Sequence, residues 1–128
     1  MKREIKFRAW HPQVKRMFEV GDIDFIKEEV MLRHWGWESS NDIDLMQYAG
    51  REDKNGRKIY EGDIIVTHPK SKYEAPKSGV VQYGGSRPMF GYKTEDGEEY
   101  DIWSSNAYRT YEVIGNVFEN PELLEVKQ

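Results

Sequence analysis

The sequence predicts a mainly β protein built from short strands. Two observations carry this prediction. Apolar and polar side chains alternate with a period of two in several short segments, which is the pattern of a strand with one buried face. Turn signals rich in Gly, Pro, Asn and Asp separate the segments of the C-terminal half at intervals of about 8–12 residues. We expect two subdomains, 1–58 and 59–128, with one continuous domain over 1–128 as the alternative division.

The N-terminal subdomain is expected to be a β meander. Residues 4–10 alternate, and Pro12 ends that strand because proline has no N–H group to donate to a sheet. The later strands are expected at 17–20, 22–26 and 28–35, followed by a loop at 35–41.

The central segment joins the two subdomains. Residues 43–48 fit either a strand or a helical turn. Asn55-Gly56 is a strong tight-turn signal, because both residue types adopt positive φ at low cost. Gly62 marks a second turn before the β-branched residues 64–66. Glycine is therefore a structural requirement at positions 56 and 62.

The C-terminal subdomain has the pattern of an SH3-like small barrel followed by a short helix. Its strands are expected at 64–66, 79–83, 89–94, 99–103 and 111–118. Residues 68–78 contain two prolines and no periodicity, which indicates an exposed loop. Gly97 lies in the Asp-Gly turn of one hairpin, and Asn120-Pro121 starts the short helix.

The same patterns predict a thin core, to which both subdomains contribute apolar residues. Its expected members are Ile5, Phe7, Phe25, Leu45, Tyr48, Ile64, Val66, Val80, Ile102, Val113 and Ile114.

Composition limits the classes of protein that the chain can belong to. The 128 residues include no cysteine, which excludes a disulfide framework and a thiolate site and fits a reducing cytoplasm. No stretch reaches the roughly 18 apolar residues of a membrane span, and the first ten residues lack the apolar run of a signal peptide. We therefore expect a soluble cytoplasmic protein with no membrane partner.

Three blocks of sequence together carry a resemblance to a known family. They are IKFRAW near the start, IDLMQYAG followed by DKNGRKIYEGDIIV in the centre, and YEVIGNVFENPELLE near the end. On these blocks the chain resembles the YopX family of bacteriophage and prophage proteins, from whose pattern it departs at Ala49 and His11. The resemblance implies a small cytoplasmic protein made in a bacterial host from phage-derived genes. It supplies no catalytic or ligand-binding residue.

The residues themselves show no catalytic constellation. The three histidines, at positions 11, 34 and 68, share no short spacing with one another, so they do not form a local metal motif. Asp63 and the pair Glu99 and Asp101 could act as acids and bases, but each also fits the pattern of an ordinary polar residue in a turn or strand. We expect a non-enzymatic protein with no catalytic residue, no metal and no cofactor.

The leading hypothesis is an accessory protein that binds a host or phage macromolecule, most simply a protein. Trp35 and Trp37 flank Gly36 and would share a face if the segment were extended, and large aromatic residues in loops are favoured interface anchors. Tyr73, in the loop 68–78, is a third candidate. An alternative is that the two tryptophans close the gap between the β halves.

The second hypothesis is a nucleic-acid-binding β-barrel. Lys6, Arg8 and Trp10 interleave cations with an aromatic ring on one strand, as single-strand binders do. The lysines of the long loop (Lys70, Lys72 and Lys77) could contact phosphates beside Tyr73. The net charge of -4 argues against a dedicated nucleic-acid binder. Residues 1–16 carry six cations against one acid, and residues 93–128 three against nine, so self-association through these opposite ends is a further expectation.

Overall fold

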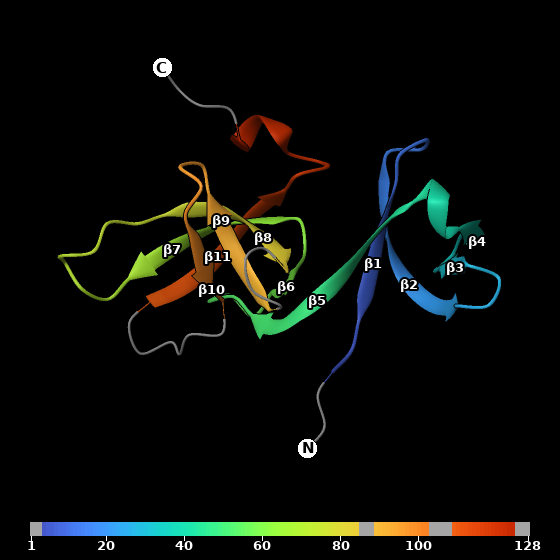
Figure 1. Cartoon of the computed structure of the whole chain (residues 1–128), viewed down its shortest axis with the longest axis horizontal. Coiled ribbons are helices and arrows are strands. Elements are labelled where there is room, and N and C mark those ends of the chain that lie inside the picture. The colour runs from blue at the N-terminus through green and yellow to red at the C-terminus, as the bar shows by residue number, and fades with distance from the viewer. Residues whose placement is uncertain (1–3, 85–88, 103–108, 125–128) are drawn as a thin grey trace. The chain divides into compact units, whose positions relative to one another are not determined.

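The structure, a computed structural model, describes residues 4–84, 89–102 and 109–124. The chain is mainly β, as predicted, and its strands form antiparallel sheets (Figure 1). It divides into two compact units, unit 1 (Met1–Tyr48) and unit 2 (Ala49–Gln128). None of the helices in the described ranges has the length and apolar character that crossing a membrane requires.

Unit 1 is a meander of antiparallel hairpins. Its strands are β1 (Phe7–His11), β2 (Arg16–Asp24), β3 (Glu29–Leu32), β4 (Gly36–Ser39) and the first part of β5 (Asp44–Glu52). They lie in the order β4-β3-β2-β1-β5, so β4 is the edge strand. The short 3-10 turn η1 (Ser40–Asp42) connects β4 to β5. The core of the unit is formed by Ala9, Phe18, Val30, Leu32 and Ile43.

Unit 2 contains a five-stranded antiparallel sheet. Its strands are β7 (Asp63–Pro69), β8 (Ser78–Tyr83), β9 (Phe90–Thr94), β10 (Glu99–Asp101) and β11 (Arg109–Asn116). They are arranged in the order β10-β9-β8-β7-β11, and β5 continues into this unit to pair with β6 (Lys58–Tyr60). The SH3-like form of the barrel stays a prediction. The expected C-terminal helix is a single 3-10 turn, η2 (Pro121–Leu124).

The predicted core is partly right. Tyr48, Ile64, Ile102 and Val113 are buried, but four other predicted members are exposed: Ile5, Phe25, Leu45 and Ile114. Phe7, Val66 and Val80 are half-buried.

Each exposed residue has a local explanation. Ile5 precedes β1, and Phe25 lies in the turn between β2 and β3. In β5 the inward positions are Met46 and Tyr48, so Leu45 points to the other face. Ile114 is the extra residue of a β-bulge, because Val113 pairs with Ile65 while Gly115 pairs with Ile64. The sequence pattern does not show such a register shift.

Candidate functional site

An aromatic cluster lies at the surface of unit 1, formed by His11, Phe18 and Trp35. The ring centroid of Trp35 is 5.3 Å from that of Phe18 and 5.6 Å from that of His11, with tilted or edge-on geometry. Such arrangements stabilise aromatic pairs beyond the area that they bury. Trp35 nevertheless remains 45% exposed, so the cluster holds one indole in a fixed position and presents part of it to solvent.

The base of the aromatic cluster is polar. The side chain of His11 is only 3% exposed, and its Nε2 atom contacts a carboxylate oxygen of Glu38, 27 residues away on β4. Its Nδ1 atom is buried and has no hydrogen-bond partner in the part of the chain that the structure describes. At the rim, the guanidinium carbon of Arg16 lies 4.9 Å from the ring centroid of Phe18. A cation therefore borders the cluster in which Trp35 is the half-exposed indole.

Trp37 lies on the free edge of the sheet, on strand β4. It is 47% exposed and pairs in register with Met31, whose side chain points away from the buried neighbours Val30 and Leu32. Trp35, in contrast, packs on the core side against Phe18. The two tryptophans would share a face only in an extended segment, and that condition is not met, because Gly36 has a φ of +136° and interrupts the extended backbone between them.

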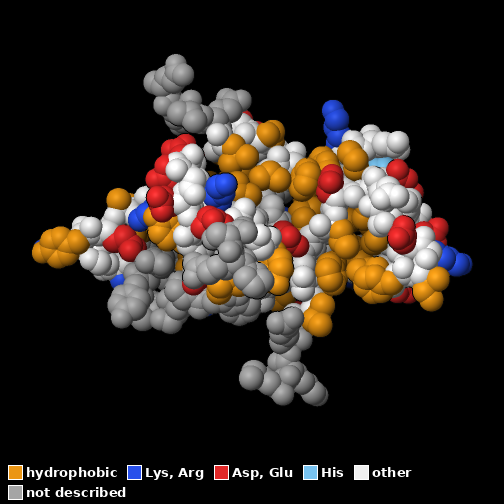
Figure 2. Space-filling model, in the orientation of Figure 1, with side chains coloured by type: hydrophobic (Ala, Val, Ile, Leu, Met, Phe, Trp, Pro, Cys, Tyr) orange, Lys and Arg blue, Asp and Glu red, His pale blue; other side chains and the backbone are white. Residues whose placement is uncertain are grey.

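Apolar side chains reach the surface of unit 1 more widely. Figure 2 shows hydrophobic side chains gathered on the visible face of this unit, with acidic and basic groups around them. Exposed large apolar residues include Phe25 and Ile26 in the β2–β3 turn, at 83% and 95%. Contiguous exposed apolar surface is a common mark of interaction sites.

The cationic candidates on the first strand are only partly available to a ligand. Arg8 and Trp10 are half-buried, and they lie on one face of β1 because they are two residues apart. Their register partners on β2 are Glu19 and Met17. Lys6 is exposed just before the strand and forms an ion pair with Glu4 at 3.7 Å. The strand thus combines cations with an aromatic ring, but acids neutralise part of the charge.

The loop between β7 and β8 carries the other cationic candidates. Tyr73 is 88% exposed, and the Nζ atom of Lys72 lies 5.4 Å from its ring centroid. Lys70 is also exposed. Lys77 is half-buried with its Nζ atom 5.3 Å from the Tyr100 ring, and its N–H donates to Thr67. The structure therefore brings Lys72 to Tyr73 and anchors Lys77 on the sheet.

The turn residues of the central block surround a buried carboxylate that the sequence analysis did not single out. Asp53 is 8% exposed. Its Oδ1 atom accepts hydrogen bonds from the N–H groups of Asn55 and Arg57 (both 2.9 Å), and its Oδ2 atom accepts one from Val113 on β11 (3.0 Å). Gly56, at a φ of +80°, closes the same turn by donating to the Asp53 carbonyl (3.0 Å).

The ionised form of Asp53 is the one that this geometry favours. Burial opposes ionisation, but the N–H groups of Val113, Arg57 and Asn55, together with the charge of Arg57, hold the pKa of Asp53 below its ordinary value. The side chain thus ties a local turn to a strand 60 residues away. No short-range pattern could have found this long-range bond.

Two further polar residues of the resemblance blocks also stabilise turns. Asp63 is fully buried, and its Oδ2 atom accepts from the N–H of Tyr60 (2.8 Å) across the turn in which Gly62 has a φ of +84°. Asn116 is 3% exposed, and its side-chain oxygen accepts from the N–H groups of Phe118 (3.0 Å) and Glu119 (2.8 Å). These groups satisfy backbone donors, which is a structural role.

The remaining turn and acid candidates lie on the five-stranded sheet of unit 2 and in its turns. Gly97 has a φ of +86° in the β9–β10 hairpin. Glu99 accepts a hydrogen bond from Gln82 (3.0 Å), and Asp101 is half-buried on the same edge strand. His68 contacts Glu112 at 2.8 Å, and this hydrogen bond, together with the nearby charge of Lys54, lowers the pKa of Glu112. Within the described ranges, no three His, Asp or Glu side chains are arranged to hold a metal ion.

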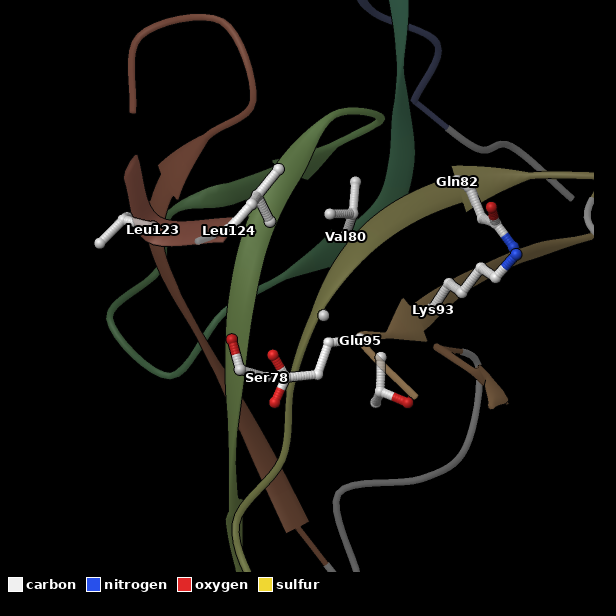
Figure 3. A pocket seen from close by; sticks show the side chains of 9 residues that line it. Ser78, Val80, Gln82, Lys93, Glu95, Leu123 and Leu124 are labelled. Atoms are coloured by element: carbon white, nitrogen blue, oxygen red, sulfur yellow. The ribbon is translucent and has the colours of Figure 1, made fainter. Parts of the chain in front are cut away.

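A shallow groove of about 490 Å³ lies on unit 2, on the face of β8 and β9 that points away from the core. Val80 lines it together with Leu123 and Leu124 of η2. Figure 3 shows Lys93 extending toward Gln82 and Glu95 lying beside Ser78. Both charged side chains, Lys93 and Glu95, are exposed, so the groove contains no desolvated pair suited to acid–base chemistry.

Comparison with known proteins gives a family match and two similar structures. The family described as YopX protein matches residues 6–125. The crystal structure of protein EF1440 from Enterococcus faecalis is similar at a TM-score of 0.70 and 28% identity, covering 97% of this chain and 100% of that one. The structure of protein yopX from Bacillus subtilis has a TM-score of 0.65 and 22% identity, covering 96% and 98%. No curated protein sequence matches the chain.

Proposed function

The chain belongs to the YopX protein family, and from this premise we propose that it is a non-enzymatic binding module that recognises a partner protein through the aromatic side chains of unit 1. The observation that carries the proposal is the half-exposed indole of Trp35, held in place by Phe18 and His11.

The geometry of Trp35 suits an interface anchor. Binding usually costs free energy because mobile side chains must be ordered, and an indole that is already packed on two rings avoids most of that cost. Tryptophan and arginine are also the residue types most enriched among energetically dominant interface positions. Arg16, at the rim of the cluster, supplies a cation beside the apolar surface. A partner with an apolar side chain next to an acidic group would fit both features.

The proposal includes no enzymatic role, and the positions of three polar side chains support that choice. Asp53, Asp63 and Asn116, which lie in the blocks that carry the family resemblance, accept hydrogen bonds from backbone N–H groups. This use of the side chains supports a structural role for them.

The proposed setting is the cytoplasm of a bacterium, where the chain would serve as a phage or prophage accessory protein. The family resemblance supports this setting, and the lack of cysteine is compatible with it. The partner would be a host or phage protein.

Affinity capture tests the proposal. The tagged wild-type protein and the Trp35→Ala variant are used to capture proteins from phage-infected bacteria, and captured proteins are identified by mass spectrometry. We expect a partner that the wild type retains and Trp35→Ala loses, with both proteins folded by circular dichroism. Tyr73→Ala is the matched control, since it removes an exposed aromatic side chain of unit 2. Equal capture by all three proteins would refute the proposal.

A second candidate function, binding of single-stranded nucleic acid, is favoured by the β7–β8 loop. There the 88% exposed ring of Tyr73 lies beside Lys72, which combines a stacking surface with a cation. Retention on a single-stranded DNA column that falls steeply with salt, and that Tyr73→Ala weakens, would support this function. Flow-through at low salt would exclude it.

A further inference from the structure

We infer that two copies of this chain pair through the free edge of β4, antiparallel, with Trp37 on the two-fold axis. The inference rests on the proposed function, which assigns binding to the exposed aromatic residues of unit 1. It adds that the partner of one of them, Trp37, is a second copy of the chain. The Trp35 cluster, on the core side of the sheet, is left for the other partner.

The backbone of β4 determines which residues can accept a new strand. The N–H of Ser40 donates to the carbonyl of Glu28 (2.8 Å), so these two residues form a hydrogen-bonded pair. Antiparallel pairs alternate between hydrogen-bonded and non-hydrogen-bonded types. The next pair, Glu29 with Ser39, and the pair Met31 with Trp37 are therefore non-hydrogen-bonded. The N–H and C=O groups of Ser39 and Trp37 consequently point to the open edge.

Only residues with outward backbone groups can be hydrogen-bonded across a β4–β4 contact, which leaves few registers. Pairing Trp37 with Trp37 of the second copy places Glu38 opposite the second copy's Gly36 and Ser39 opposite its Trp35, which precedes the strand. Pairing Trp37 with Ser39 places Glu38 opposite the second copy's Glu38, and like charges directly opposite destabilise a sheet. The first register is thus the favoured one.

The side chains agree with that register. Residues directly opposite in an antiparallel pair project on the same face, so the two Trp37 indoles would lie together with their Cα atoms about 5.5 Å apart. Aromatic cross-strand pairs of this kind stabilise sheets. Trp37 is 47% exposed in the single chain, and this contact would cover it.

The residues that flank β4 carry opposite charges, and two-fold symmetry would bring the cation of one copy beside the acid of the other. Arg33 precedes the strand and Asp42 follows it, and both are exposed. An antiparallel arrangement sets the Arg33 end of one copy beside the Asp42 end of the other. Arg33 already forms an ion pair with Glu19 (2.7 Å) in its own chain. We therefore expect the contact between Arg33 and Asp42 of the two copies to affect the orientation and the rate of association more than the affinity.

The expected dimer is weak. β4 has four residues, and a contact built on it falls below the roughly 1,200 Å² of a stable interface. We therefore expect a dissociation constant on the order of micromolar to millimolar. Such a dimer exchanges readily and depends on protein concentration.

Sedimentation equilibrium of charge variants at the axis tests this arrangement. A residue on a two-fold axis meets its own copy, so Trp37→Glu and Trp37→Lys each place like charges together. We expect the wild type to rise from 15.1 kDa toward twice that mass with concentration. Each variant alone should show a dissociation constant raised at least about tenfold, and an equimolar mixture of the two should recover association. Tyr73→Glu, in unit 2, is the matched control and should behave as the wild type.

Three outcomes would overturn the inference: a wild type that stays monomeric up to the order of 1 mM, variants that associate as the wild type does, or a mixture that fails to associate. Far-UV circular dichroism is the check that both variants keep their strands. A monomeric wild type that still captures a partner through Trp35 would leave the proposed function standing. A dimer that captures nothing would overturn the proposed function and leave this inference standing.

Discussion

Replacing Asp53 with alanine should lower the free energy of unfolding by about 4 kcal/mol. The carboxylate accepts three backbone hydrogen bonds, and the one from Val113 is buried. A buried donor left without a partner costs about 1–3 kcal/mol, for which we take about 2. Asn55 and Arg57 are exposed residues, so we take the loss at each of their N–H groups as the net value of a hydrogen bond, about 1 kcal/mol.

The assay is urea and thermal unfolding followed by far-UV circular dichroism. A loss of about 4 kcal/mol should lower the melting temperature by at least about 10 °C in a protein of this size. Asp24→Ala is the matched control, because Asp24 Oδ1 accepts from Ile26 and Lys27 (both 3.0 Å) in an exposed turn and makes no long-range side-chain hydrogen bond to the residues that the structure describes. The control should lose about 1 kcal/mol. The reasoning is refuted if Asp53→Ala loses no more than Asp24→Ala.

The same carboxylate should make stability depend on pH. Because the folded-state pKa of Asp53 lies below its ordinary value of about 3.9, its ionised form stabilises the fold above that pH. This contribution is lost as pH falls through the lowered pKa. Asp53→Asn removes the titration, so the stability difference between wild type and Asp53→Asn should be constant near neutral pH and shrink below about pH 4. A difference that grows on acidification would contradict the argument.

The remaining predictions concern close approaches and exposed rings. Gly115→Ala should lower the free energy of unfolding by about 1–3 kcal/mol, because a Cβ there would lie 2.6 Å from Oδ1 of Asn120. This loss should be smaller in an Asn120→Ala background, which a double-mutant cycle of unfolding free energies measures. Gly91→Ala should destabilise unit 2 by about 2 kcal/mol or more, since its Cβ would meet the Tyr100 carbonyl oxygen at 2.5 Å, and a denaturation midpoint equal to that of the wild type would exclude this. Tyr73→Ala should change unfolding free energy by less than about 0.5 kcal/mol, as measured in urea, because its ring is 88% exposed.

Period-two alternation predicted the fold class because it reports local chain geometry. It indicated a strand over residues 4–10, where the structure has β1 at Phe7–His11, and it correctly favoured Ile64 and Ile102 as core residues. It failed at Phe25, where the chain turns. There Asp24 accepts two backbone hydrogen bonds, which ends the strand although the apolar pattern continues. A side-chain cap of this kind competes with the sheet and is hard to distinguish from an ordinary polar strand residue.

Only some features of the candidate site could be predicted from the sequence. The tryptophans stood out by residue type, but their opposite orientation depends on the φ of Gly36, which no pattern specifies. The contact between His11 and Glu38 spans 27 residues, and that between Asp53 and Val113 spans 60. Pairings over such separations follow from sheet register and not from neighbouring residues. The resemblance blocks identified the family, whereas the structural role of their buried polar groups depends on contacts that form only in the fold.

The most direct test of the account is quantitative capture of the partner protein by folded wild type and folded Trp35→Ala at equal concentration. The account predicts that retention falls at least about tenfold when the indole is removed, while the melting temperature shows that the sheet is intact. Undiminished retention by Trp35→Ala, or a loss caused instead by Tyr73→Ala, would contradict the claim that the aromatic side chains of unit 1 form the binding surface.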